Sequence, residues 1–213
     1  MRGCAIFDLD GTIIDNSSEQ VFLKYLIELG ELPVGNLLRW AMDFIRLRDL
    51  REAKANKVYL QGACEARLRS LAHDCFQERL AQHISPKIPQ LMEQHRACGR
   101  AVVILSGSLE LLVEQFHRWL HTDSMVGYRL EVREGKVTGG RIGLNPYGEN
   151  KAKLTQALAA QHGFELSASY AYGNHASDAH KLRLVGNPVA ANPDRKLRRI
   201  AQRNGWPIVR FHE

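Results

Sequence analysis

The stretch Phe7–Thr12, which reads FDLDGT, decides the fold expected for this chain of 213 residues. The short apolar run Ala5–Phe7 ahead of the first acid predicts a buried strand that ends in a polar loop. Residues two apart in an extended segment point to the same side, so the carboxylates of Asp8 and Asp10 are expected to face one cavity. A bare DxD pair is usually a loop cap, but the apolar run before it and the Gly-Thr after it favour a site.

This pair of acids suggests phosphate chemistry. Two neighbouring carboxylates repel each other unless a cation lies beside them, and all-oxygen ligands suit Mg²⁺. One carboxylate can then attack phosphorus while the other handles the proton of the leaving group.

Residues 16–82 show a helical pattern without an obvious strand. Apolar side chains recur at helical spacing from Val21 to Leu71. A segment of this length is too long for an ordinary crossover between two strands. We therefore expect an inserted all-helical cap at residues 16–82, with residues 1–15 and 83–213 forming the core.

The rest of the chain alternates between strand and helix patterns. This alternation predicts an α/β fold, in which a mostly parallel, Rossmann-like sheet is covered on both faces. Glu134-Gly135, between two strand-like stretches, predicts a hairpin. The expected strands after the cap are Ala101–Leu105, Tyr128–Arg133, Lys136–Ile142, Ser169–Tyr172, Leu184–Ala190 and Ile208–Phe211. The expected helices cover residues 88–98, 109–120 and 149–162, and a further helix begins near Pro193.

Polar side chains follow three of the expected strands. Asp8 and Asp10 follow the first, Ser106 follows the second, and Asn174 and Asp178 follow a later one. Ligands bind beyond the carboxyl ends of the strands in open parallel sheets, so these residues are expected on one rim of the sheet.

Two further signals near helix starts are weaker by themselves. Ser106-Gly107-Ser108 precedes a helix, whose free N–H groups favour an anion, although a structural N-cap is the commoner reading of such a serine. Lys151 lies near the start of its expected helix, where most lysines are solvated.

Four motifs in order resemble those of the haloacid dehalogenase superfamily of phosphotransferases. FDLDGT resembles the first motif, and ILSGS at Ile104–Ser108 resembles the second. Lys151 in YGENKAKL resembles the third, and YGNHASD at Tyr172–Asp178 resembles the fourth. The helical segment follows the first motif, as in the phosphoserine phosphatase-like branch. The resemblance covers nearly the whole chain and implies a Rossmann-like core with a helical cap.

The resemblance also implies catalytic roles. Asp8 would be the nucleophile that forms an aspartyl-phosphate, and Asp10 would protonate the leaving group and then activate water. Lys151 would pair Asp8 with the phosphate and so reduce the repulsion between like charges. The groups that would hold the phosphoryl oxygens are the side chains of Thr12 and Ser106 and the backbone N–H of Gly107.

The implied cofactor is Mg²⁺, and one position departs from the family's pattern. The resemblance assigns the metal to Asp8, Asp10, Asn174 and Asp178, with Asp10 contributing its backbone carbonyl. The family normally has an acid directly after the glycine of the fourth motif, where this chain has Asn174. An amide oxygen can ligate Mg²⁺ but carries no charge, so a weaker metal affinity is expected.

Composition limits the other possibilities. Lys and Arg number 29 against 23 Asp and Glu, which gives a formal charge of +6. No segment is apolar enough to span a bilayer, and the start of the chain lacks the pattern of a signal peptide, so the cytoplasm is the expected location. The basic stretch Arg195–Arg203 has no aromatic residues or known motif, so no specific nucleic-acid partner is expected. The oligomeric state remains open.

We therefore expect a Mg²⁺-dependent phosphomonoester hydrolase that acts on a small phosphorylated metabolite. Phosphoserine phosphatases usually carry a Glu nine residues after the nucleophile, where this chain has Ser17, so phosphoserine itself is not the expected substrate. One alternative is a phosphate-ligand binding protein with little turnover, which Asn174 motivates. Another is a lipid-phosphate phosphatase at a membrane surface, which the positive charge and the apolar cap motivate. Hydrolysis of an aryl phosphate separates the enzyme from the binding protein, and co-sedimentation with liposomes tests the lipid hypothesis.

Overall fold

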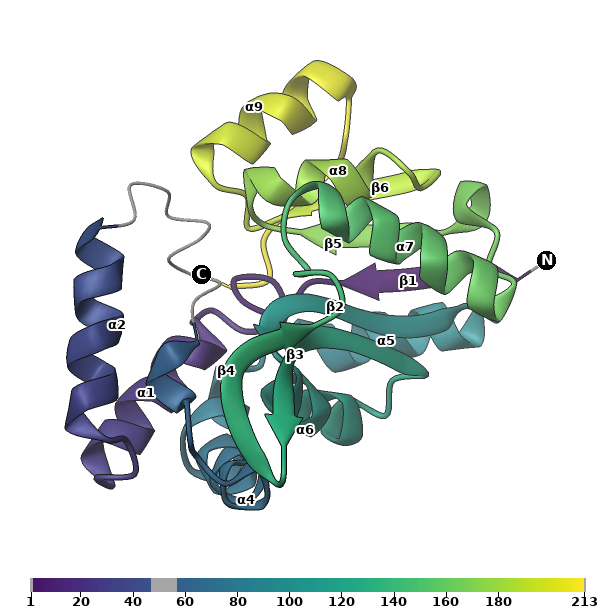
Figure 1. Ribbon diagram of the computed structural model, residues 1–213. Coiled ribbons are helices and arrows are strands. Elements are labelled where there is room, and N and C mark those ends of the chain that lie inside the picture. Colours follow the sequence, from purple (N-terminus) through teal and green to yellow (C-terminus); the bar gives the residue numbers. More distant parts are fainter. Residues whose placement is uncertain (1, 47–56, 213) are drawn as a thin grey trace.

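The computed structural model describes residues 2–46 and 57–212, which form an α/β fold around one seven-stranded sheet (Figure 1). The strand order is β4-β3-β2-β1-β5-β6-β7, and every neighbouring pair is parallel except β3 and β4. The strands are β1 (Cys4–Phe7), β2 (Ala101–Leu109), β3 (Ser124–Arg133), β4 (Lys136–Ile142), β5 (Tyr170–Gly173), β6 (Asn187–Ala191) and β7 (Ile208–Val209). The predicted, mostly parallel Rossmann-like sheet is confirmed.

Helices cover both faces of the sheet. Those on one face are α7 (Glu149–His162), α8 (Ala179–Leu182) and α9 (Arg195–Asn204). Those on the other face are α5 (Lys87–Ala97) and α6 (Glu110–Leu120). The side chains of β1 alternate between the two apolar clusters, because Ile6 packs with α7, α8 and α9 while Ala5 and Phe7 pack with α5 and α6. The central strand is buried along its whole length.

The described part of residues 16–82 is helical, as predicted. It contains α1 (Ser18–Glu28), α2 (Val34–Arg46), the 3₁₀ turn η1 (Val58–Leu60), α4 (Glu65–Cys75), a π turn at Phe76–Leu80 and a 3₁₀ turn at Ala81–His83. Residues 47–56, which also belong to the predicted cap, lie outside the described residues.

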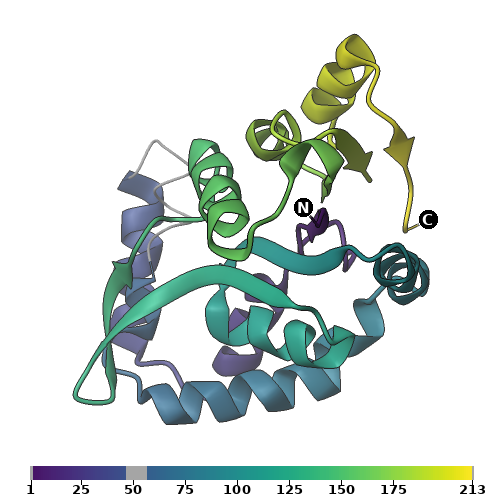
Figure 2. The same ribbon diagram turned by 90° about the vertical axis from the view of Figure 1, so that its right-hand side faces the viewer.

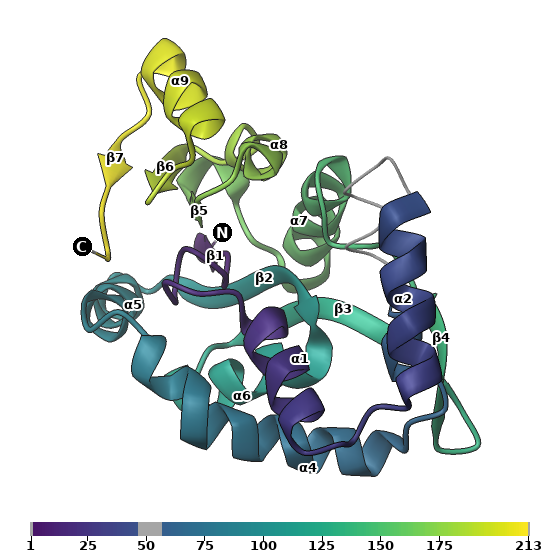
Figure 3. The ribbon, with the colours of Figure 1, turned by 90° about the vertical axis from the view of Figure 1, so that its left-hand side faces the viewer.

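These helices share an apolar cluster with the sheet. Phe22 of α1 and Leu68 of α4 belong to the same buried cluster as Phe116 of α6. Phe76 meets Phe116 edge-on, with ring centroids 5.0 Å apart. Figures 2 and 3 show α4 running along α6, whereas α2 lies at the outer edge of the molecule. The division into a core and a separate cap stays a prediction.

Several strand boundaries differ from the predicted ones. β3 begins at Ser124 instead of Tyr128, and β7 ends at Val209 instead of Phe211. β2 continues to Leu109, so Ser106-Gly107-Ser108 lies within the end of the strand and α6 begins one residue later than expected. The reason is β3, which pairs with β2 on both sides of an irregularity and keeps this stretch extended up to the pair Leu109–Tyr128. β6 begins at Asn187 instead of Leu184.

A buried histidine joins α5 to the middle of the sheet. His95 is 4% exposed, its Nε2 lies 2.8 Å from Tyr172 Oη, and its ring packs 4.8 Å from that of Tyr170. Its Nδ1 has no hydrogen-bond partner among the residues that the structure describes. Burial, helped by the charge of Arg100, lowers the pKa of His95 from 6.5 to about 4.

This lowered pKa makes the stability of the fold depend on pH. The folded protein keeps His95 neutral, whereas the unfolded chain protonates it near its ordinary pKa. Its contribution to stability is therefore complete above the unfolded pKa and is lost as the pH falls toward the folded pKa. We expect the free energy of unfolding to fall by about 2 kcal/mol between about pH 7 and about pH 5 because of this residue.

Urea unfolding of the wild type and of His95→Gln at both pH values measures this effect, because Gln keeps a polar group near Tyr172 but does not titrate. His162→Gln, at the exposed end of α7, is the matched control and should keep the wild-type pH dependence. If the free energy of unfolding falls equally in His95→Gln and in the wild type between the two pH values, the assignment of this effect to His95 is contradicted.

Candidate active site

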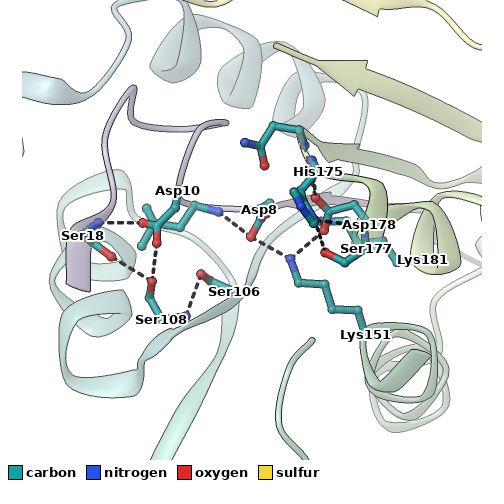
Figure 4. Close-up of polar contacts among 12 residues, drawn as sticks. Asp8, Asp10, Ser18, Ser106, Ser108, Lys151, His175, Ser177, Asp178 and Lys181 are labelled. Atoms are coloured by element: carbon teal, nitrogen blue, oxygen red, sulfur yellow. Dashed lines mark hydrogen bonds and ion pairs between the residues drawn. The ribbon is translucent and has the colours of Figure 1, made fainter. Parts of the chain in front are cut away.

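The carboxyl ends of three neighbouring strands bring the predicted residues together (Figure 4). β1 lies between β2 and β5, so the loops that follow these strands meet at one rim. Asp8 follows β1, Ser106 lies near the end of β2, and Asp178 lies in the turn after β5. Lys151 reaches these residues from the first turn of α7, although it lies far from each of them in sequence.

A lysine between two carboxylates forms the centre of the site. Lys151 Nζ lies 2.9 Å from Asp8 Oδ1 and 2.6 Å from Asp178 Oδ1. Lys181 Nζ lies 3.5 Å from the same oxygen of Asp178. The side chains of Asp178 and Lys181 are fully buried, and those of Asp8 and Lys151 are almost fully buried.

The charges of this cluster shift one another's pKa values. Burial alone would raise the pKa of Asp178, but Lys151 and Lys181 outweigh burial and hold that pKa well below its usual range. Burial alone would lower the pKa of Lys151, and its attraction to Asp178 and Asp8 raises that pKa instead. Burial and the charge of Asp178 raise the pKa of Asp8, while Lys151 opposes the rise. Asp178 and Lys151 are therefore charged at neutral pH.

Asp178 also fixes the loop that follows β5. Its Oδ2 accepts hydrogen bonds from the backbone N–H groups of Asn174, at 3.2 Å, and His175, at 3.1 Å. Gly173 is required here, because a Cβ at this position would lie 2.6 Å from the Cβ of Asp178. Both oxygens of Asp178 are thus engaged by protein groups. The contacts that the structure shows are positioning contacts, and its role as a metal ligand stays a prediction.

The second acid of the first motif has different partners. Asp10 Oδ1 accepts from the backbone N–H of Ser18 at 3.0 Å, and Asp10 Oδ2 accepts from Ser108 Oγ at 2.7 Å. Ser18 Oγ donates to Ser108 Oγ at 2.9 Å. Burial raises the pKa of Asp10 to about 6 in spite of these hydrogen bonds. A carboxyl group with this pKa carries a proton for part of the time near neutral pH, as a general acid must.

The three predicted phosphate-binding residues lie around the same rim. Ser106 is almost fully buried, and its Oγ accepts from the backbone N–H of Ser108 at 3.1 Å. Gly107 comes close to the carbonyl of Pro146, since a Cβ added to it would lie 3.3 Å from that oxygen. Thr12 is fully buried, and its Oγ1 has no hydrogen-bond partner among the described residues. Their phosphate-binding roles stay predictions.

Asn174 lies against the loop that carries the two acids. A Cβ added to Gly11 would lie 2.0 Å from Asn174 Nδ2, so the amide group rests directly on this loop. Gly11 also has a φ of 72°, a left-handed conformation that favours glycine. His175 turns away, because its Nδ1 accepts from the backbone N–H of Ser177 at 3.1 Å and its Nε2 lies 3.5 Å from Asp194.

Sequence reasoning did not predict the contacts that three residues make with the acids of the site, although it considered Ser18 as a helix cap or a reader of the leaving group. Ser108 and Ser18 hold Asp10, and Lys181 pairs with Asp178. The alternation of β2 could have indicated Ser108, which is two residues after Ser106 and therefore on the same side of the strand. Lys181 had a weaker signal, three residues after Asp178 in a short helix, and nothing in the sequence indicates that it is fully buried.

A mostly parallel sheet that carries two acids, a buried lysine and polar loops at its carboxyl edge defines a Rossmann-like α/β protein with a candidate active site at that edge. Residues 5–183 match the haloacid dehalogenase-like hydrolase family, and the chain belongs to this family. The predicted family and the prediction of an enzyme are both confirmed. No helix within the described ranges is long and apolar enough to cross a membrane.

Relatives with similar sequences extend over nearly the whole chain. A protein of Streptomyces azureus described as an inhibition of morphological differentiation protein is 36% identical over 99% of this chain and 79% of its own length. A probable phosphatase of Mycobacterium tuberculosis is 33% identical, with coverage of 99% and 76%. A histidinol-phosphatase of Neisseria meningitidis is 28% identical, with coverage of 99% and 100%.

Solved structures show the same fold. A protein of unknown function from Bordetella pertussis superposes with a TM-score of 0.88 and 22% identity, covering 100% of both chains. A phosphoserine phosphatase in its apo form superposes with a TM-score of 0.69 and 16% identity, covering 100% of this chain and 94% of its own. The predicted likeness to the phosphoserine phosphatase branch is therefore confirmed at the level of the fold.

The buried Asp178 carboxylate should be essential for stability. Asp178→Asn removes the charge that pairs with two buried ammonium groups. Lys151 keeps its ion pair with Asp8, but Lys181 loses the one ion pair that it forms among the described residues. We expect the free energy of unfolding to fall by about 3 kcal/mol, because breaking a buried ion pair on one side leaves an uncompensated charge.

Urea unfolding at neutral pH measures this change. Glu93→Gln is the matched control, since it removes a carboxylate that is 71% exposed and pairs with Arg96. It should change stability by less than about 0.5 kcal/mol. A loss in Asp178→Asn no larger than in this control would show that the cluster does not hold the fold together.

Proposed function

We propose that this protein is a phosphomonoester hydrolase that works through an aspartyl-phosphate on Asp8. The observation that carries the proposal is the ion pair of Asp8 with the buried Lys151, 2.9 Å apart, next to an acid with a raised pKa, Asp10. Membership of the hydrolase family and a relative named as a probable phosphatase support the same reaction.

The reaction has two displacements at phosphorus. In the first, a carboxylate oxygen of Asp8 forms a bond to phosphorus while the bond to the leaving oxygen breaks, and Asp10 gives its proton to that oxygen. In the second, the oxygen of a water molecule forms a bond to phosphorus while the bond between phosphorus and the Asp8 oxygen breaks, and Asp10 takes a proton from that water. This step releases inorganic phosphate and restores both acids to their starting states.

The other residues of the rim stabilise the charge that moves during these steps. Lys151 neutralises part of the negative charge on Asp8 and on the phosphoryl oxygens, so the two anions can approach each other. Ser106 Oγ and the N–H of Gly107 supply hydrogen bonds to the phosphoryl group. Asp178 keeps Lys151 in place and charged, and we assign it this positioning role.

The residues present fit a Mg²⁺ ion that is held with little protein charge. The donors would be a carboxylate oxygen of Asp8, the carbonyl of Asp10 and the amide oxygen of Asn174, a residue whose amide nitrogen rests against the same loop. These are the hard oxygen ligands that Mg²⁺ takes. When bound, the ion would neutralise charge on the phosphoryl oxygens. Within the described residues, no group of three His, Cys, Asp or Glu side chains is placed to hold a metal.

The substrate class that we propose is a small, soluble phosphorylated metabolite. Relatives named histidinol-phosphatase and phosphoserine phosphatase are named for small, polar phosphate esters. The helical segment contacts the site through Ser18, whose backbone N–H and hydroxyl bind Asp10 and Ser108. We propose that residues 16–82 act as the cap that covers the leaving group and limits the access of water.

The nucleophile can be tested with Asp8→Asn, which keeps the size of the side chain and removes the charge of the attacking oxygen. We expect hydrolysis of an aryl phosphate to fall by at least about 1,000-fold. Asp74→Asn on α4 is the control and should keep wild-type turnover. Beryllium fluoride should label the wild type at Asp8, as measured by mass or density. Turnover close to wild type in Asp8→Asn would overturn the mechanism.

Asn174 should determine how strongly the free protein binds Mg²⁺. Asn174→Asp adds one negative charge beside Asp8, so Mg²⁺ should bind more tightly in a calorimetric titration. The activity should rise more at limiting metal than at saturating metal. Asn204→Asp adds the same charge at the exposed end of α9 and should leave metal binding unchanged. Identical binding isotherms for the wild type and Asn174→Asp would show that residue 174 is not a ligand.

A further inference from the structure

Residues 208–212 return to the loop that carries the two catalytic acids (Figure 1). Asn192, which follows β6, donates from its Nδ2 to the carbonyl of Gly11 at 3.0 Å and accepts at its Oδ1 from the N–H of Phe211 at 2.8 Å. His212 donates from its Nε2 to the carbonyl of Thr12 at 3.1 Å. These hydrogen bonds hold the segment against the nucleophile loop.

A pocket of about 390 Å³ lies between this segment and the nucleophile loop. Gly11 and Asn174 contribute to its lining from the catalytic side, and Arg198 of α9 and Arg210 contribute from the other. Its volume lies within the range of sites that bind small molecules. The pocket therefore adjoins the catalytic loop instead of lying on a remote surface.

The pocket is positively charged. Among the residues that the structure describes, no hydrogen bond or ion pair of the Arg198 or Arg210 guanidinium is found. Asp15 is the one acid in the described lining, and its side chain is 52% exposed and bonded to His83 Nδ1 at 2.8 Å. Two guanidinium groups without partners beside one engaged carboxylate leave a net positive charge for a ligand.

We propose that this pocket binds a second anionic group, a carboxylate or phosphate, carried by the alcohol part of the substrate. The inference rests on the proposed phosphomonoesterase function and narrows its substrate class. Guanidinium groups bind carboxylate and phosphate oxygens with paired hydrogen bonds. Gly11, which lines the pocket, directly follows Asp10 in the first motif. Asn174, the proposed metal ligand, also lines the pocket, so a substrate bound there would lie next to that residue.

A matched pair of substrates tests this proposal. Butyl phosphate and 4-phosphonooxybutanoate have the same phosphate ester and chain length and differ in a terminal carboxylate. We expect the wild type to have the higher kcat/KM for the carboxylated ester. In the double variant Arg198→Gln/Arg210→Gln, the ratio of the two kcat/KM values should fall by about fivefold or more. In the wild type, the same ratio should fall as the salt concentration rises, because salt screens the charges. Arg199→Gln, an exposed position on the same helix, should keep the wild-type ratio.

Calorimetry provides a readout that does not depend on turnover. The wild type should bind 4-phosphonobutanoate more tightly than butylphosphonate, and the double variant should lose this difference. A wild type that hydrolyses neither ester but keeps the calorimetric preference would overturn the proposed function and support the subsite. Hydrolysis of both esters with equal ratios in the wild type and the double variant would overturn the subsite and leave the phosphatase assignment standing.

Discussion

The buried carboxylate of Asp178 is the constraint on which the rest of the site depends. A charge with no exposure to solvent is tolerated only when partners compensate it, and here Lys151, Lys181 and two backbone N–H groups do so. Those partners come from α7, α8 and the loop after β5. Satisfying one carboxylate therefore docks α7 against the sheet and shapes the loop that carries Asn174. Lys151 is left with its remaining contact directed at Asp8, which explains how a residue so distant in sequence meets the nucleophile.

Asp10 ties the helical segment to the chemistry. Its two oxygens accept from Ser18, at the first turn of α1, and from Ser108, at the end of β2. Neither partner is charged, so burial dominates and raises the pKa of Asp10 to about 6. Asp8 and Asp10 are two residues apart and both carboxylates, yet a lysine contacts the first and only neutral groups bond the second. Burial raises the pKa of both carboxyl groups, but the charge of Lys151 opposes the rise only at Asp8, and this difference suits the roles of attacking anion and proton donor.

The sequence predicts the fold more completely than the site. Apolar periodicity predicts the hairpin at Glu134-Gly135 and helix α7 with its observed limits, because these features are local. The parallel sheet pairs distant strands, and it is predicted from the alternation of strands with helices and from the resemblance of the four motifs. The end of β2 is predicted wrongly, since pairing with β3 extends it and no pattern within the strand records that pairing. Lys181 is missed for a similar reason. A lysine is normally a solvated residue, and its burial here depends on Asp178 and on the packing of α8, which only the assembled fold brings together.

The distribution of charge gives a reason for coupling between cation and substrate in the proposed mechanism. Among the described residues of the centre, Lys151 is shared by Asp8 and Asp178, and Lys181 contacts only Asp178. The pair of lysines therefore compensates most of the negative charge that the protein has buried. Asn174 adds an oxygen to the rim without adding charge. A divalent cation beside Asp8 would find little uncompensated protein charge until a phosphate group arrives with its own. On this distribution, binding of the cation and binding of the phosphorylated substrate reinforce each other, since each supplies the charge that the other lacks.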